Sequence, residues 1–274
     1  MRAICCIALA SLSLCSQTTW AAPPTDPDKV PALRPGVLAG YLAAGSWVDS
    51  LALLPPPPEA GSAQQAADDA AYKNARALKD GPRGALAARD AVLAFPKAAE
   101  TFQCALGIAI SEQGTPHLNM LLRRSYVDAG LATYRAKDHY KRQRPFVAAN
   151  EGTCTPQDEA TLRRDGSYPS GHAALGWAWG LILTEVAPER ANALMQRAKA
   201  FGQSRVVCGV HWQSDVDAGQ LVGSAAVAQL HGNADFNQQL ALARAEVASA
   251  RAANAAPVVD CAAEAQALGA AAGK

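Results

Sequence analysis

The sequence has few aromatic residues, almost no net charge and no long apolar run after its first residues. Aromatic residues make up 6% of the 274 positions, whereas half are apolar, with alanine prominent among them. Because alanine favours helices while aromatic and β-branched residues favour strands, this composition argues for packed helices rather than a β-sandwich. The formal net charge of +1 argues against nucleic acid or an anionic membrane surface as a partner. We therefore expect an all-α protein.

The first 21 residues have the pattern of a cleaved signal peptide. Arg2 precedes an apolar stretch over residues 3–14, which is too short to span a bilayer. Small residues at the −3 and −1 positions place cleavage after Ala21. A lipoprotein signal at Cys15 is the weaker alternative, because the bulky Leu14 precedes it. No later run is long enough to cross a membrane, so we expect a soluble protein in the periplasm or the medium, without integral membrane association.

Four cysteines remain once the signal peptide is removed, and no two of them have C-x2-C spacing. They are Cys104, Cys154, Cys208 and Cys261. An even number of cysteines in an exported chain predicts two disulfides, with three possible connectivities. The only ligand-like spacing is Cys208–x2–His211, and one such pair is too little for a structural zinc site. We expect no metal and no other cofactor.

Helical patterns fill most of the remaining chain, which we interpret as one domain. We expect an extended arm over residues 22–36, an all-helical domain over residues 37–255 and an alanine-rich tail over residues 256–274. The expected helices are 37–44, 63–93 with a break near 81–84, 95–109, 117–137, 170–186, 188–203, 214–231 and 235–255. Four prolines at 55–58 are either a linker or a rigid segment on the domain surface. Because apolar residues directly precede them, we favour the rigid segment.

Residues 168–172 begin a helix in a way that suits an anion. Pro169 fits a first helical turn, Ser170 is a cap or a phosphate donor, and Gly171 lets the backbone approach an anion closely. N–H groups and the positive end of the helix dipole form an anion cradle at such a terminus. His172 would face the same anion. By itself, the segment more often marks a plain helix start with a hydrogen-bonded histidine.

Arg205, His211 and Asp215 form a second candidate group. The i, i+4 spacing of His211 and Asp215 puts them on one helical face, where the carboxylate fixes the histidine tautomer. The other ring nitrogen then presents a lone pair, as a nucleophile or a base requires. Arg205 offers a planar fork of donors for phosphate oxygens. Alone, this segment would by default be a surface salt bridge with a flanking arginine.

Lys137 and Arg144 lie in a basic cluster with Arg135, Lys141 and Arg142. A run of charges is usually a solvated face, and this is our interpretation of Arg135, Lys141 and Arg142. Lys137 and Arg144 stand apart because the two histidine segments follow them in the chain.

Together, the three segments resemble the tripartite signature of the type-2 phosphatidic acid phosphatase superfamily. A closer resemblance, over about residues 41–243, is to the bacterial class A non-specific acid phosphatases. It rests on LALLPPPP at 51–58, AKDHY at 136–140, GSYPSGH at 166–172 and GVHWQSDVD at 209–217. Cys154 and Cys208 lie in segments where relatives also have cysteine, whereas Cys104 and Cys261 look like additions. The resemblance therefore implies the pairs Cys154–Cys208 and Cys104–Cys261.

The resemblance also implies a single helical bundle of the type-2 phosphatidic acid phosphatase and vanadium haloperoxidase kind. It implies metal-independent hydrolysis of phosphate monoesters through a phosphohistidine. By position, His211 is similar to the nucleophile, Asp215 to the carboxylate that orients it, and His172 to the general acid. The residues similar to the phosphate-binding set are Lys137, Arg144, Ser170, Gly171 and Arg205. Since His172 is more often protonated at mildly acidic pH, we expect an acidic optimum.

Three other functions share parts of this pattern. A vanadate-dependent haloperoxidase has the same anion-binding signature, but the matches outside the motifs favour hydrolysis. An integral lipid phosphate phosphatase would need membrane spans. A non-catalytic periplasmic phosphate-binding protein would need neither two histidines nor an orienting carboxylate. We expect small-molecule phosphate monoesters as partners and no nucleic acid. Phosphoryl transfer to an alcohol is chemically available, and the resemblance leaves a homo-oligomer open.

The three remaining histidines, His117, His139 and His231, are expected to be structural or surface residues. His139 is the hardest to assign because it lies inside the first motif.

Overall fold

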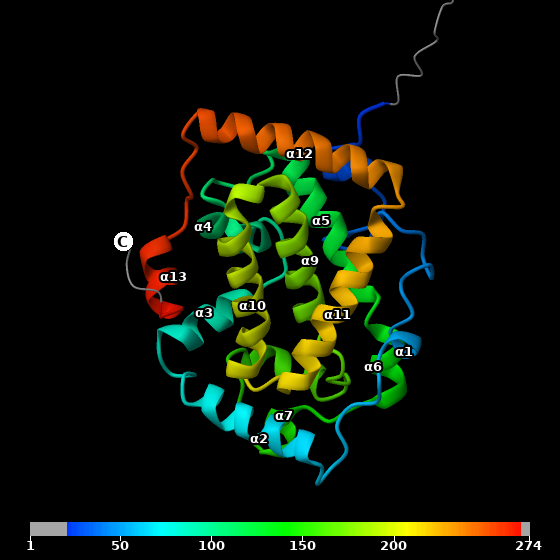
Figure 1. The fold of residues 1–274 in the computed structure, drawn as a ribbon, viewed down its shortest axis with the longest axis vertical. Coiled ribbons are helices and arrows are strands. Elements are labelled where there is room, and N and C mark those ends of the chain that lie inside the picture. Colours follow the sequence, from blue (N-terminus) through cyan, green and yellow to red (C-terminus); the bar gives the residue numbers. More distant parts are fainter. Residues whose placement is uncertain (1–20, 270–274) are drawn as a thin grey trace, which may run out of the picture.

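Four long helices run side by side through the middle of the molecule (Figure 1). The computed structural model describes residues 21–269, so the predicted signal peptide, apart from Ala21, lies outside the described residues. The four central helices are α5 (Pro116–Leu131), α9 (Gly171–Val186), α10 (Ala191–Val207) and α11 (Gln213–Leu230). Helix α12 (Ala234–Ala252) crosses one end of this group, and α2 (Ala63–Arg76) crosses the other. The expected all-α architecture is confirmed.

Helix α9 occupies the centre because it is apolar on nearly every face. Its side chains are largely buried, including the fully enclosed Trp179, and it packs against α5, α10 and α11. Glycine brings α11 close to it: a Cβ on Gly223 would lie 2.3 Å from the carbonyl oxygen of Ala174. This close packing fixes the N-terminus of α9, where His172 lies, relative to the start of α11.

Shorter elements connect and cover these helices. The short α-helices are α1 (Ser50–Leu53), α3 (Pro82–Asp90), α4 (Gln103–Leu106), α6 (Tyr134–Tyr140), α7 (Pro145–Ala148), α8 (Glu159–Leu162) and α13 (Cys261–Ala267). Single 3₁₀ turns form at Pro27–Lys29, Lys97–Phe102, Pro156–Asp158 and Pro188–Arg190. None of the helices within residues 21–269 combines the length and apolar character that a membrane span requires.

The prediction of a helix over residues 37–44 is wrong. A short antiparallel hairpin forms instead, from β1 (Ala32–Arg34) and β2 (Val37–Leu38). Pro35 and Gly36 make its turn, and Gly36 has a φ of +77°, which glycine adopts without strain. The expected helix over 117–137 divides into α5 and α6, and the one over 95–109 becomes a 3₁₀ turn followed by α4. The other expected helices are confirmed to within a few residues.

The four consecutive prolines pack on the domain as the rigid segment we favoured. They connect α1 to α2, and Leu54 just before them is buried. The hydroxyl of Tyr168 donates a hydrogen bond to the carbonyl of Pro55 at 2.9 Å. The segment is therefore held against the loop that leads into α9.

Two disulfides join distant parts of the chain. Cys104 is bonded to Cys261, at a sequence separation of 157, and Cys154 is bonded to Cys208, at a separation of 54. These are the two pairs that the family resemblance implied. The first attaches α13 beside α3, where Glu264 of α13 also contacts buried Arg197 at 3.3 Å. The alanine-rich C-terminal segment therefore includes a helix that packs on the domain.

Candidate active site

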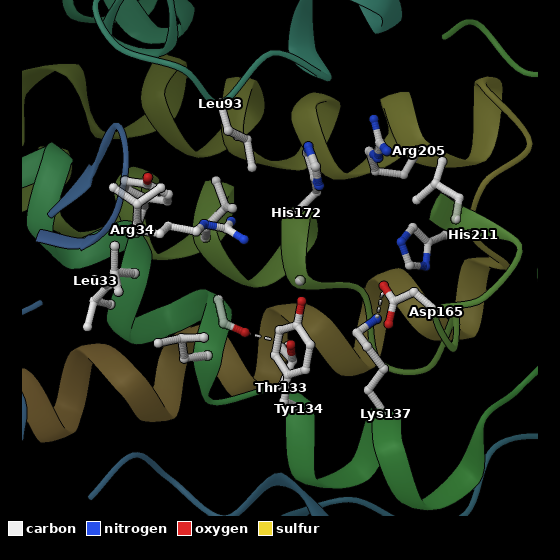
Figure 2. Close-up of a pocket in the computed structure, with 18 of the residues that line it drawn as sticks. Leu33, Arg34, Leu93, Thr133, Tyr134, Lys137, Asp165, His172, Arg205 and His211 are labelled. Atoms are coloured by element: carbon white, nitrogen blue, oxygen red, sulfur yellow. Dashed lines mark hydrogen bonds and ion pairs between the residues drawn. The ribbon is translucent and has the colours of Figure 1, made fainter. Parts of the chain in front are cut away.

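The three sequence segments meet around one cavity of about 360 Å³. Figure 2 shows its walls, which come from α5, α6, the N-terminus of α9, α10 and the turn before α11. The predicted site residues that line it are Lys137, Arg144, Gly171, His172, Arg205 and His211. Ser170 and Asp215 lie just behind this wall, and neither is exposed.

His211 is held by a partner at each ring nitrogen. Nδ1 lies 3.4 Å from Oδ2 of Asp215, and Nε2 lies 3.0 Å from Nη1 of Arg144. A guanidinium can only donate, so Nε2 must accept and Nδ1 must carry the proton. This tautomer leaves the lone pair of Nε2 on the cavity side, as a nucleophile requires.

Asp215 is positioned by the start of its own helix. Its Oδ2 accepts a 2.8 Å hydrogen bond from the backbone N–H of Trp212, which caps α11. Its Oδ1 accepts from Nη1 of Arg142 at 2.7 Å. Complete burial raises the pKa of Asp215, and the charge of Arg142 opposes that rise. Arg142 therefore stabilises the ionised form of the carboxylate behind His211.

The interpretation of Arg142 as a solvated residue is wrong. Its side chain is only 8% exposed, and it bridges Asp215 to Asp68 of α2, which it contacts at 2.8 Å. Ser214 completes the cluster, donating from its hydroxyl to Asp68 at 2.5 Å. The interpretation holds for its neighbour Arg135, whose side chain is 69% exposed.

Replacing Arg142 by glutamine is expected to lower kcat by roughly 10- to 100-fold, as losses of supporting groups behind reactive side chains often do. Two buried carboxylates would then face each other without a cation, and the pKa of Asp215 would rise. We therefore expect the acidic limb of the pH–kcat profile to move to higher pH. Arg135→Gln, with the same charge change at an exposed site, is the control. An unchanged profile in Arg142→Gln would contradict this role.

Lys137 and Arg144 are held by backbone carbonyls and by Asp165. Nζ of Lys137 donates to the carbonyls of Gly166 at 2.8 Å and Pro169 at 3.1 Å. Nη2 of Arg144 donates to Oδ2 of Asp165 at 3.0 Å. Burial, together with the charge of the neighbouring Arg144, lowers the pKa of Lys137 to about 8. Both side chains remain cationic at acidic pH.

Arg205 is a buried cation that has few acceptors around it in the described part of the chain. It is 3% exposed, and its Nε and Nη1 have no hydrogen-bond partner among the described residues. Burial lowers its pKa to about 10, so the guanidinium stays charged. A buried charged donor without an acceptor is costly. An anion in the cavity, which Arg205 lines beside His172 and His211, would remove that cost (Figure 2).

His172 faces the same space from the first turn of α9. Nε2 lies 3.2 Å from the carbonyl oxygen of Ala91, so Nε2 carries a proton and Nδ1 is the nitrogen left for a ligand. Its ring stacks on Phe201. Burial lowers the pKa of His172 well below its usual value, and the charge of Arg205 lowers it further. Burial and Arg205 therefore favour the neutral form of His172, and a bound anion would raise its pKa.

Ser170 serves as the cap rather than lying on the cavity wall. Its hydroxyl accepts from the N–H of Ala173 at 3.2 Å, and its own N–H donates to the carbonyl of Asp215 at 2.9 Å. The second bond ties the start of α9 to the start of α11. The histidines expected to be structural lie outside the cavity lining: His117 contacts Gln239, and His139 and His231 are exposed.

Several lining residues were not anticipated from the sequence. They are Leu33, Arg34, Val37, Leu93, Tyr126, Thr133, Tyr134 and Asp165, with further apolar neighbours. Asp165 could have been found, because it directly precedes GSYPSGH and a carboxylate there can pair with Lys137 and Arg144. The hairpin residues carry no local signal for a site.

Comparison with known proteins agrees with this fold and site. A family model described as the PAP2 superfamily matches residues 117–235, which include all three segments. A non-specific acid phosphatase of Providencia stuartii is 47% identical over 209 residues, covering 76% of this chain and 84% of that protein. An acid phosphatase of Zymomonas mobilis is 43% identical over 207 residues, covering 74% and 77%. A non-specific acid phosphatase of Salmonella typhimurium is 45% identical over 201 residues, covering 73% and 80%.

These matches extend over most of the chain and well beyond the three motifs. The chain therefore belongs to the class A non-specific acid phosphatases of the PAP2 superfamily, and it is an acid phosphatase.

Proposed function

We propose that the protein hydrolyses small phosphate monoesters in two in-line steps through a phosphohistidine at Nε2 of His211. The observation that carries this proposal is the arrangement around His211. Asp215 holds Nδ1, and Nε2 turns its lone pair toward a cavity lined by Lys137, Arg144 and Arg205. In-line phosphoryl transfer requires a nucleophile, a proton donor opposite it, and cations around the equatorial oxygens.

In the first step, Nε2 of His211 attacks phosphorus and the bond from phosphorus to the ester oxygen breaks. The leaving oxygen takes a proton from Nδ1 of His172, while Nδ1–H of His211 stays hydrogen-bonded to Asp215. Lys137, Arg144 and Arg205 hold the equatorial oxygens. The bond from Arg144 to Nε2 must open as substrate binds, which frees that N–H for a phosphate oxygen. These cations provide the charge that developing negative oxygens need.

In the second step, water attacks the phosphohistidine on the opposite side. His172, neutral after the first step, accepts a proton from this water as the bond from phosphorus to Nε2 breaks. Inorganic phosphate leaves and the site returns to its starting state. An alcohol in place of water would give a new phosphate ester, which is the phosphotransferase reaction.

We expect kcat to hold as the pH falls from 6.5 to about 5, and to decline as the pH rises toward about 8. Burial lowers the pKa of His211 well below its usual value, and Arg144 and Lys137 lower it further, so the nucleophile stays unprotonated in mild acid. To act as the acid, His172 must be protonated at both ring nitrogens in the enzyme–substrate complex. It loses the proton on Nδ1 as the pH rises through the pKa of the imidazolium, which the bound substrate raises. Because that pKa is lower in the free enzyme, kcat/KM should decline at lower pH than kcat. A kcat profile that is flat or rises past about 8 would contradict these roles.

We also propose that the protein is exported to the periplasm or the medium. The pattern of residues 1–21 supports export, and two disulfides suit an oxidising compartment.

Product partitioning tests the covalent intermediate. Purified protein is given p-nitrophenyl phosphate, phenyl phosphate or glycerol phosphate with a fixed concentration of methanol, with EDTA present throughout. If all three esters give the same phosphoenzyme, the ratio of methyl phosphate to inorganic phosphate is the same for each. A ratio that depends on the leaving group would show direct attack by water and overturn the phosphohistidine. Loss of activity in EDTA would overturn the assignment of phosphate binding to side-chain cations alone.

A further inference from the structure

The cavity extends beyond what a phosphate group needs. Its other part is apolar, and its lining includes Leu33 of the β1–β2 hairpin, Leu93 and Tyr126. Leu33 is 50% exposed, a large apolar side chain left open at the edge of the site. If the proposed function holds, the phosphorus lies at His211, so this part receives the alcohol portion of the ester.

Arg34 places a cation in this apolar part. Figure 2 shows its side chain reaching from the hairpin into the cavity, on the side of His172 away from His211. Arg34 is an exposed residue of β1, so its guanidinium is accessible to a ligand in the cavity. Burial raises the pKa of the Tyr126 hydroxyl, and the charge of Arg34 is the largest influence opposing that rise. The charge therefore lies near the aromatic wall.

The charges of the cavity exceed those of one phosphate group. Arg34, Lys137, Arg144 and Arg205 line it together with one carboxylate, that of Asp165. Leaving the two histidines aside, these four cations and one carboxylate give three net positive charges, whereas a phosphate monoester dianion carries two negative ones. The cation left over is Arg34, because the other three surround His211. A second anionic group on the substrate would balance it.

We propose that the β1–β2 hairpin forms a leaving-group subsite that selects aromatic phosphate monoesters bearing a second anionic group. The aromatic ring lies between Leu33 and the wall formed by Leu93 and Tyr126. The second anion pairs with Arg34, whose planar fork of donors suits a carboxylate. This inference rests on the proposed function and adds the class of alcohol that the site prefers.

The test compares phenyl phosphate with its 3- and 4-carboxy derivatives and the matching neutral carboxamides. For wild-type protein, we expect kcat/KM for at least one carboxylate to exceed that of its carboxamide by about three- to tenfold, as for a partly exposed Arg–carboxylate pair. In Arg34→Gln this preference disappears, because the carboxylates lose more kcat/KM than phenyl phosphate and the carboxamides do. Arg135→Gln, which removes the same charge from an exposed site outside the cavity, retains the preference.

A second variant tests the apolar wall. Leu33→Ser should lower kcat/KM for phenyl phosphate by about three- to tenfold, the effect of losing about one buried methylene group, and leave glycerol phosphate unchanged. Equal turnover of carboxylates and carboxamides by wild type would overturn the subsite, as would a preference that survives Arg34→Gln. An equal loss on all esters in Arg34→Gln would also overturn it. Failure of wild type to hydrolyse phenyl phosphate at all would instead overturn the proposed function.

Discussion

Replacing His211 by alanine is expected to lower kcat for p-nitrophenyl phosphate by at least about a thousandfold, because removal of a covalent nucleophile leaves only binding and charge stabilisation. No other described side chain is placed to replace it. His172 lies in the same cavity, but no carboxylate among the described residues orients its ring as Asp215 orients that of His211; its Nε2 contacts the carbonyl of Ala91 instead. The measurement is steady-state hydrolysis near pH 6 with EDTA, at saturating substrate.

His139→Ala is the matched control for this variant. His139 belongs to the first sequence motif, but it is exposed and lies outside the cavity lining, so its loss should leave kcat unchanged. Circular dichroism and thermal unfolding would show that both variants keep the helical fold. A folded His211→Ala protein with substantial activity would contradict the assignment of the nucleophile.

Replacing His172 by glutamine is expected to affect esters according to their leaving group. Alkoxides need a proton as they leave, whereas p-nitrophenolate is a weak base that leaves without one. We therefore expect kcat/KM for glycerol phosphate to fall by roughly 10²–10⁴-fold, the usual contribution of a general acid, and that for p-nitrophenyl phosphate to fall much less. Since His172 also activates water in the second step, the phosphoenzyme should accumulate. A rapid burst of p-nitrophenol, equal to the enzyme concentration, would report it.

His231→Gln is the control for that substitution, because His231 is exposed and pairs with Glu185 away from the cavity. Equal losses of kcat/KM on both esters, without a burst, would contradict proton transfer by His172. Such a result would assign His172 a positioning role through its contacts with Ala91 and Phe201.

Most of the helices could be predicted because their signals are local. Alanine-rich apolar periodicity defined the long helices, and Gly81–Pro82 placed the break between α2 and α3. The division between α5 and α6 has no such signal. It depends on a turn in which the hydroxyl of Thr133 donates to the carbonyl of Gly130 at 2.6 Å. The hairpin at β1 and β2 was missed because apolar residues after Gly36 suit a strand as well as a helix.

The site residues also divide into those that local sequence patterns predict and those that only the tertiary fold places. Spacing within short segments is sufficient to pair His211 with Asp215 and to put Ser170 at a helix cap. Arg142 was assigned to a solvated face because its neighbours in sequence are charged, whereas its burial depends on Asp68, which lies 74 positions earlier. Arg34 likewise reaches the cavity only through the tertiary fold. Long-range contacts of this kind leave no pattern in the local sequence.

Trapping the phosphoenzyme is the most direct test of the central claim. Protein mixed rapidly with p-nitrophenyl phosphate is quenched in alkali, in which phosphohistidine survives, and its peptides are analysed by mass spectrometry. The account predicts one added phosphoryl group on the peptide that contains His211, more of it in His172→Gln, and none in His211→Ala. A phosphoryl group on another residue, or none in His172→Gln during active turnover, would contradict it.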